Sequence, residues 1–327
     1  MRADRYYPGF RGGNLKWEAE NIAGLLGIPH VGEVFYVDPG NGNDTANAGK
    51  RQDDAFKTIT QGYAALTADQ DDVLVIAGES ATGRTAETAV ITWAKRRTHM
   101  MGNGAPRRIN SRNGLGTDST LTGETTTAIF TVTGNNCIFA NMSFATFQDN
   151  NILVDVQSDY NTFMNVHFQG MGIQASADDA DARSLLLTGA EENEFINCTI
   201  GLDTVTRGAA NSSLELTGNA CARNKFINCD FPIFTDAATP TWVKADTGNC
   251  YERFLQFENC FFNNPDGSSS TTLTIGFDLS TTGNGDINLL NCNWRGATDL
   301  ANNYTRLFSN SPVVNTANQG LMIIAAT

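Results

Sequence analysis

The stretch FINCTI, residues 195–200, decides the fold of this 327-residue chain because it recurs at a nearly constant interval. Successive copies begin 31 or 32 residues apart, and a weaker copy, IFANMSF at residues 138–144, places its asparagine 24 residues before Asn165. A constant period predicts one structural unit stacked on copies of itself, which is a solenoid. The other copies are FMNVHF (163–168), FINCDF (226–231), FENCFF (257–262) and LLNCNW (289–294).

Each copy alternates in character as a short strand does. In FINCTI the alternation predicts one side for Phe195, Asn197 and Thr199 and the other side for the residues between them. Asparagine suits a turn because it tolerates left-handed backbone angles. The cysteines come one per coil without C-x-x-C spacing, so we expect them to be small apolar core residues and not metal ligands. These core cysteines are Cys198, Cys229, Cys260 and Cys292.

The segments between the copies also read as strands, for example SSLELTG (212–218) and TTLTIGFDLS (271–280). No helical pattern separates the copies, and the period is too short for propeller blades. We therefore predict an all-β, right-handed parallel β-helix. Residues 34–78 are expected to hold the opening strand and a capping helix, and residues 79–327 the coils and a C-terminal cap.

Composition and charge exclude several classes of function. The net charge is −13 with a pI near 4.6, which argues against general nucleic-acid binding. The seven cysteines fit a reduced interior better than a disulfide framework. No run of 18 apolar residues occurs, so no membrane span is expected. The first ten residues show no signal-peptide core, and we expect assembly in a cytoplasm.

Residues 1–33 lie outside the repeat and predict a basic, aromatic arm. The first sixteen residues hold four basic residues and one acidic residue. Leu15, Ala19, Ile22 and Leu26 follow at helical spacing, with Asn14 as the expected N-cap. We expect this arm to anchor the protein on a partner surface; the alternative is a strap packed on the solenoid's own end. The expected partner-binding residues are Arg2, Arg5, Tyr6, Tyr7, Phe10, Arg11 and Trp17.

A helix over residues 54–66 is predicted next, with Asp53 or Asp54 as its N-cap and Phe56, Ile59, Tyr63 and Leu66 on one face. Such a helix would cover the open apolar end of a solenoid. The order Tyr-Val-Asp-Pro, Gly-x-Asp, Ala-Phe-Lys-Thr-Ile and a strand ending in glycine, over residues 36–78, resembles the first segment of pectate-lyase-like β-helix proteins. Many phage tailspikes and other virion proteins share this segment, so the resemblance implies the fold more strongly than any activity.

Motifs for catalysis are sparse. The acidic cluster Asp178, Asp179 and Asp181 is either a calcium-binding loop or, as we favour, a solvated turn. Arg183, Arg207, Arg223 and Arg253 are expected to be isolated in separate coils, and His167 is expected on a surface or in a ladder. Residues 95–112 hold six basic residues and no acidic one, which suits either an external partner or neighbouring acidic coils. No catalytic residue, metal ligand or cofactor site is predicted.

These observations lead us to expect a non-enzymatic structural virion protein of a tailed bacteriophage. It would be a homotrimeric capsid decoration or head fibre, attached to capsid or tail proteins by its arm, without membrane or nucleic-acid contact. The alternative is a tailspike-like depolymerase or a carbohydrate-binding receptor protein acting on host-surface polysaccharide. A depolymerase requires paired carboxylates in a groove, and a binding protein requires exposed aromatic platforms.

Overall fold

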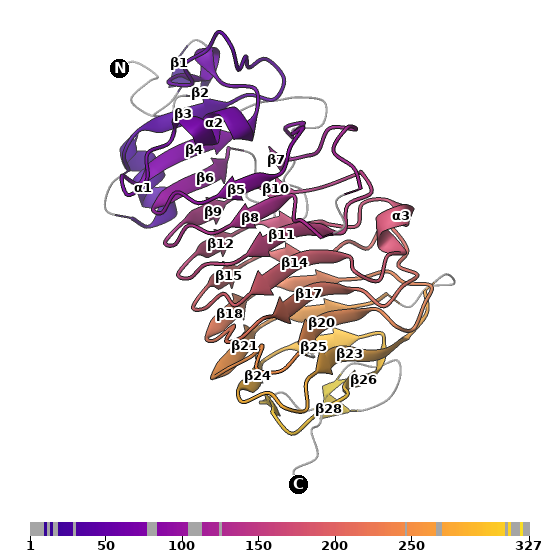
Figure 1. The fold of residues 1–327 in the computed structure, drawn as a ribbon. Coiled ribbons are helices and arrows are strands. Elements are labelled where there is room, and N and C mark those ends of the chain that lie inside the picture. Colours follow the sequence, from indigo (N-terminus) through magenta and orange to yellow (C-terminus); the bar gives the residue numbers. More distant parts are fainter. Residues whose placement is uncertain are drawn as a thin grey trace.

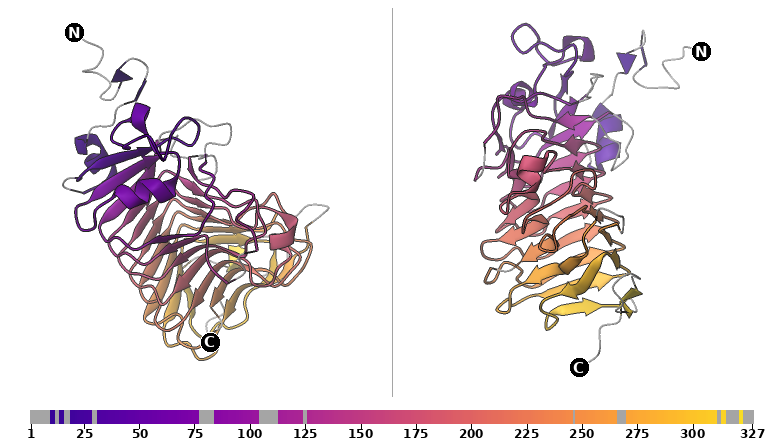
Figure 2. Two further views of the ribbon diagram at one scale, coloured as in Figure 1. Left: turned by 45° about the horizontal axis from the view of Figure 1, so that its top comes forward. Right: turned by 90° about the vertical axis from the view of Figure 1, so that its right-hand side faces the viewer.

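The computed structural model describes residues 10–11, 14–15, 19–28, 31–76, 84–103, 113–123, 126–245, 247–265, 270–310, 313–314 and 321–322. The chain coils through three parallel sheets, and each coil in the middle of the solenoid adds one strand to each sheet (Figure 1). The result is the predicted right-handed parallel β-helix, an elongated solenoid whose coils follow one another in sequence order (Figure 2). The prediction of an all-β solenoid is confirmed.

Sheet 1 has ten strands and runs the length of the solenoid. Its strands are β3 (Val34–Val37), β4 (Asp72–Ile76), β6 (Thr98–Gly102), β9 (Ile138–Ala140), β12 (Thr162–Met164), β15 (Glu194–Ile196), β18 (Asn224–Ile227), β21 (Phe254–Glu258), β24 (Asp286–Leu290) and β27 (Leu307–Ser309).

Sheets 2 and 3 complete each coil. Sheet 2 holds β7 (Gly114–Leu115), β10 (Ser143–Phe144), β13 (His167–Phe168), β16 (Thr199–Ile200), β19 (Asp230–Pro232), β22 (Phe261–Asn263) and β25 (Asn293–Arg295). Sheet 3 holds β5 (Ile91–Trp93), β8 (Phe130–Val132), β11 (Ile152–Val156), β14 (Arg183–Thr188), β17 (Ser212–Thr217), β20 (Thr241–Ala245), β23 (Leu273–Leu279) and β26 (Ala297–Ala301). Two antiparallel hairpins, β1 (Phe10–Arg11) with β2 (Asn14–Leu15) and β28 (Val313–Val314) with β29 (Leu321–Met322), lie outside the sheets.

The repeated asparagine is a corner of the coil and not a residue within a strand. Asn197 has φ of 54° and joins β15 of sheet 1 to β16 of sheet 2. This left-handed turn restarts the alternation, so Phe195, Cys198 and Ile200 all point into the core. The expected phase, which placed Phe195 with Thr199, is therefore wrong. The predicted roles of asparagine in the turn and of cysteine in the core are confirmed.

Stacked rings fill the core. Phe163, Phe195 and Phe226 follow one another up sheet 1 with ring centroids 4.8 and 4.5 Å apart. This spacing matches the distance between neighbouring strands, so each ring lies over the ring of the preceding coil. All three are completely buried, and burying a phenylalanine contributes about 1.5–3 kcal/mol. The repeat therefore stabilises itself coil by coil.

Helix α2 (Ile59–Ala65) covers the first coil, as the sequence predicted, but it begins later than expected. Its N-cap is Thr58, whose hydroxyl accepts from the Gln61 N–H at 3.2 Å. Asp53 and Asp54 lie instead in a separate 3-10 turn, η2 (Gln52–Asp54). The buried carboxylate of Glu87 also accepts the Ile59 N–H at 2.8 Å, which suits the positive end of a helix.

Helix α1 (Ala19–Leu26) packs on the outer face of sheet 1. Its Ile22 and Leu26 are buried against Val73 and Val75, so this part of the arm is a strap on the solenoid itself. Asn14 belongs to β2 and does not cap the helix. Of the expected partner-binding residues, Phe10 and Arg11 make up strand β1. Arg2, Arg5, Tyr6, Tyr7 and Trp17 lie outside the described residues.

Within the described ranges, no helix has the length and apolar character needed to cross a membrane.

Candidate functional site

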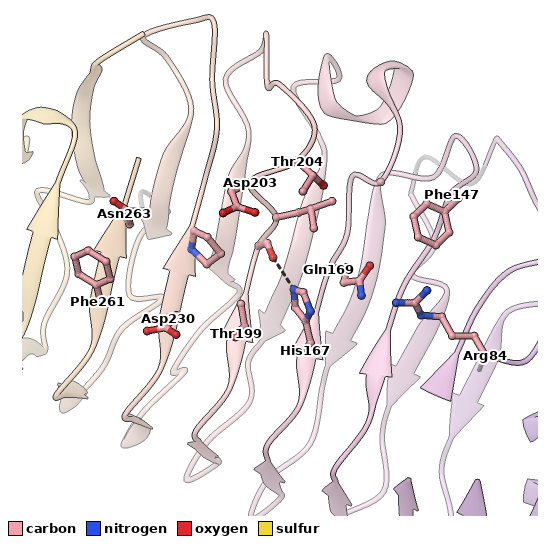
Figure 3. Close-up of a pocket in the computed structure, with 14 residues that line it drawn as sticks. Arg84, Phe147, His167, Gln169, Thr199, Asp203, Thr204, Asp230, Phe261 and Asn263 are labelled. Atoms are coloured by element: carbon pink, nitrogen blue, oxygen red, sulfur yellow. Dashed lines mark hydrogen bonds between the residues drawn. The ribbon is translucent and has the colours of Figure 1, made fainter. Parts of the chain in front are cut away.

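A groove of about 540 Å³ runs across the outer face of sheet 2 (Figure 3). Its floor comes from side chains at one register position of successive strands. Strand pairing aligns His167 with Thr199, Thr199 with Asp230, and Asp230 with Phe261. Because the strands are parallel and in register, these residues from four coils form one row along the solenoid axis.

Each residue of this row follows an inward-facing cysteine or its equivalent, and precedes an inward-facing aromatic or aliphatic residue. In β19, Asp230 faces the groove while Phe231 is buried in the core. In β22, Phe261 is exposed and Phe262 is buried. The alternation within each short strand therefore places the variable residue of the repeat in the groove.

Exposed aromatic rings lie toward the two ends of the groove (Figure 3). Phe147 is 49% exposed, and the Arg84 guanidinium lies 5.5 Å from its ring centroid. At the other end, Phe261 is 40% exposed. Arg84 also donates to the Ser143 hydroxyl at 3.2 Å, which fixes its position beside β10. Arginine over an aromatic ring is a favourable cation–π contact.

The middle of the groove is polar. His167 is only 3% exposed, although it faces outward, and its Nε2 lies 3.0 Å from the Gly201 carbonyl oxygen. An Nε2–H that donates to this carbonyl fixes the ring orientation. Gly201 has φ of 116°, and a side chain there would collide with the Pro232 carbonyl 2.4 Å away. Glycine is therefore required where the loop passes the groove floor.

Two carboxylates line the same groove. Asp230 projects from β19, and Asp203 projects from the loop that follows β16. The amides of Gln169 and Asn263 lie on either side of them along the axis (Figure 3). Two carboxylates in one groove are the groups that a glycoside hydrolase uses as acid and base or nucleophile.

The sequence-predicted acidic cluster has a different setting. It lies outside the groove, in the turn that follows the short helix α3 (Gln174–Ala177), where Asp178 and Asp181 are exposed, as the favoured solvated turn predicted. Asp178 Oδ1 accepts from the Gln174 side-chain amide at 2.8 Å. Over the residues that the structure describes, no group of three or more histidine, cysteine or acidic side chains could hold a metal ion.

Two of the arginines expected to be isolated are paired across coils. Arg223 donates to Glu191 at 3.0 Å and also pairs with Glu192, and Arg183 pairs with Glu215. The expectation was wrong because residues about 31 positions apart in sequence are neighbours in adjacent coils.

In the basic stretch at residues 95–112, the described side chains bind to groups of the same chain. Lys95 Nζ donates to the Tyr63, Ala64 and Leu66 carbonyls at 2.7–3.0 Å, at the C-terminal end of α2. Arg96 pairs with Asp69 at 2.9 Å. Residues 104–112 lie outside the described residues.

The groove residues Arg84, Phe147, Asp203, Asp230 and Phe261 were not predicted from the sequence. A signal for two of them was present, because the residue after each repeated cysteine is the groove position in β16, β19 and β22. Arg84, Phe147 and Asp203 come from loops, for which the repeat predicts no direction.

No family model matches the chain, and no curated protein matches it in sequence. Among solved structures, the pectate lyase Pel9A has a TM-score of 0.51 at 15% identity, covering 80% of this chain and 63% of the lyase. The pectin methylesterase from Aspergillus niger has a TM-score of 0.52 at 14% identity, covering 85% of this chain and 84% of the esterase. This chain thus spans less than two thirds of the lyase. It has the pectate-lyase-like parallel β-helix fold.

The comparison corrects the expectation of a non-enzymatic protein. Both solved structures to which this chain is compared are enzymes, a pectate lyase and a pectin methylesterase. That expectation rested on the lack of acidic motifs whose residues are close in sequence. A solenoid instead assembles a site from separate coils, so the absence of a compact motif was not informative.

Proposed function

We propose that this protein is a carbohydrate-active enzyme that binds and cleaves a polysaccharide in the sheet 2 groove. One observation carries the proposal: a single groove holds two carboxylates, Asp203 and Asp230, between two exposed aromatic rings, Phe147 and Phe261. This activity is that of a tailspike-like depolymerase, the alternative expected from the sequence. The similarity of the fold to a pectate lyase and a pectin methylesterase supports a polysaccharide substrate.

The groove has the length and lining that an oligosaccharide needs. From β10, where Arg84 bonds to Ser143, to β22 there are four strand spacings, or about 19 Å. A sugar chain would lie along the solenoid axis, with the apolar faces of two sugar rings against Phe147 and Phe261. The amides of Gln169 and Asn263 would bond sugar hydroxyls between them.

In this proposal the carboxylates of Asp203 and Asp230 perform the cleavage. One protonates the oxygen of the glycosidic bond as that bond breaks. The other removes a proton from the attacking water or attacks the sugar carbon itself, and the separation of the two carboxyl groups selects between these routes. His167, fixed by the Gly201 carbonyl, supports the groove floor beneath them.

The test is cleavage of capsular and surface polysaccharides by the variants Asp203→Asn and Asp230→Asn. Each should lower the rate about 10²- to 10⁴-fold while oligosaccharide binding persists. The matched control is Asp181→Asn, at an exposed acidic position outside the groove, which should keep full activity. Full cleavage by both groove variants would contradict the assignment. Binding without cleavage by the wild type would reduce the proposal to a carbohydrate-binding receptor.

The proposed setting is a phage particle, with residues 1–33 as the attachment region and a homotrimer as the assembled form. The resemblance of residues 36–78 to phage tailspikes supports this setting. Because Ile22 and Leu26 cover Val73 and Val75, an attachment test should remove only residues 1–18 and leave the α1 strap in place. The truncated protein should fold and sediment as a trimer but fail to join particles. Normal incorporation would contradict the attachment role.

A further inference from the structure

Arg207 is a buried arginine in the loop between β16 and β17. Its side chain belongs to the largest that are fully buried, with 1% exposure. Its main chain is held by the next coil, because the Arg207 N–H donates to the Phe234 carbonyl at 2.9 Å and the Thr235 hydroxyl donates to the Arg207 carbonyl at 2.7 Å. Yet neither Nη1 nor Nη2 has a hydrogen-bond acceptor among the described residues.

The positive charge of the Arg207 guanidinium has no negatively charged partner among the described residues. Within the described ranges, no carboxylate forms an ion pair with it. Burial, together with the nearby positive charge of Arg183, lowers the pKa of Arg207 to about 9, so the group remains cationic at neutral pH. Arg183 itself pairs with Glu215. A buried cation that lacks a partner is strongly unfavourable in a protein interior.

The hydroxyl group of Ser213, beside Arg207, also lacks a partner among the described residues. Arg207 Nη2 and Ser213 Oγ lie 3.2 and 2.8 Å from the position that a Cβ on Gly201 would occupy, so the two groups share one corner behind the groove floor. Ser213 Oγ has no hydrogen-bond partner among the described residues. Unused donors of this kind are normally satisfied by a bound ion or water.

We propose that Arg207 and Ser213 bind a small inorganic anion, such as chloride, in this corner between loop 201–211 and sheet 3. The anion would neutralise the guanidinium and accept from its Nη groups and from the Ser213 hydroxyl. Binding would hold the loop whose residues Leu202, Asp203 and Thr204 form one wall of the groove. The anion is a structural ligand of the chain and does not depend on what the groove binds.

Crystals of the wild-type protein grown with bromide provide the direct test. An anomalous difference peak within hydrogen-bonding distance of the Arg207 Nη atoms and Ser213 Oγ is expected. A normal water at this position, with no anomalous signal at high bromide, would overturn the proposal. Because this experiment uses the wild type, it remains decisive even if Arg207 variants do not fold.

Stability provides a second test that needs no enzymatic activity. Chloride is raised at constant ionic strength, with the large organic anion gluconate as the replacement. The wild-type Tm should rise by at least about 2 °C, because the anion binds only the folded state. Arg207→Met should lose this dependence, whereas the control Arg223→Met, which removes a partly exposed arginine paired with Glu191 and Glu192, should keep it. Equal chloride dependence in Arg207→Met would overturn the assignment.

Discussion

The thiol of Cys229 donates a hydrogen bond of 3.3 Å to the main-chain carbonyl of Phe195, one coil earlier. The same relation links Cys260 to Phe226 at 3.3 Å and Cys292 to Phe257 at 3.3 Å. Each thiol therefore fills a narrow part of the core and also bonds the coil beneath it. The cysteine ladder is a structural feature of the stack, because these sulfurs are buried and bonded to the backbone.

The seven cysteines should be unreactive in the native protein. All are buried, and burial raises the pKa of Cys137 to about 11 and that of Cys221 to about 12. Since the thiolate is the reactive form, Ellman's reagent at pH 8 should titrate no native thiol within minutes and all seven after denaturation. The variant Thr281→Cys, at an exposed turn position, should add one fast-reacting thiol. Rapid native labelling of a natural cysteine would contradict the buried ladder.

The corner asparagines should be sensitive to alanine. Asn228 has φ of 54°, a conformation in which an alanine is strained by about 1–2 kcal/mol. We expect Asn228→Ala to lower the free energy of unfolding by about this amount in urea titrations, and Asn228→Gly to lower it less because glycine adopts this φ freely. Asn293→Ala, at an exposed strand position, is the control and should change stability by less than about 0.5 kcal/mol. Equal losses at the two positions would refute the turn argument.

Stability should fall as the pH drops below about 6.5, in part because of His99. This side chain is 2% exposed, its Nδ1 accepts from the Ile138 N–H at 3.1 Å, and its Nε2 lies 3.4 Å from Asp71. Burial lowers the pKa of His99 despite the neighbouring carboxylate. The unfolded chain therefore binds the proton more readily than the folded chain, and stability is lost as the histidine becomes protonated on unfolding.

Replacing His99 should flatten this part of the pH profile. The neighbouring Asp71 affects a different pH range. Burial would raise the pKa of Asp71, but the hydrogen bond and charge interaction with Arg97 outweigh burial, so the pKa of Asp71 is lowered. Asp71 therefore contributes its own loss of stability only at more acidic pH, near and below about 4. Urea titrations of His99→Gln from pH 7 to 5 separate the two groups. If the free energy of unfolding of His99→Gln still falls with the wild-type slope between pH 7 and 5, a group other than His99 causes the loss of stability.

The exposed rings of the groove should contribute to sugar binding. Phe147→Ala and Phe261→Ala should each weaken oligosaccharide binding about 3- to 10-fold, the effect of losing one stacking contact. Phe308→Ala is the matched control, since Phe308 is 52% exposed but lies on β27 of sheet 1. Isothermal titration with a bound oligosaccharide measures the effect, and a similar loss in all three variants would point to an indirect cause.

Much of the fold could be predicted because the repeat encodes it locally. The step of 31 or 32 residues is visible when copies are compared, and the turn at Asn197 and the buried Cys198 follow from the residues of a single copy. Helix α2 was predictable from its apolar face, and only its N-cap at Thr58 was misplaced. The phase error at Phe195 arose because one left-handed residue divides what looks like a single strand into two.

The candidate site was not predictable in the same way. Asp230 occupies a repeat position, but its meaning depends on Thr199 and Phe261 one coil to either side. Arg84 and Asp203 come from loops of unequal length, and Arg207 gives no sign in sequence that it is buried. The sequence by itself determined the solenoid, because the turn and core residues act within one coil and their constant period repeats that coil. Only the tertiary structure decided the groove and the Arg207 corner, because each is formed by side chains from several coils that meet only when the coils stack.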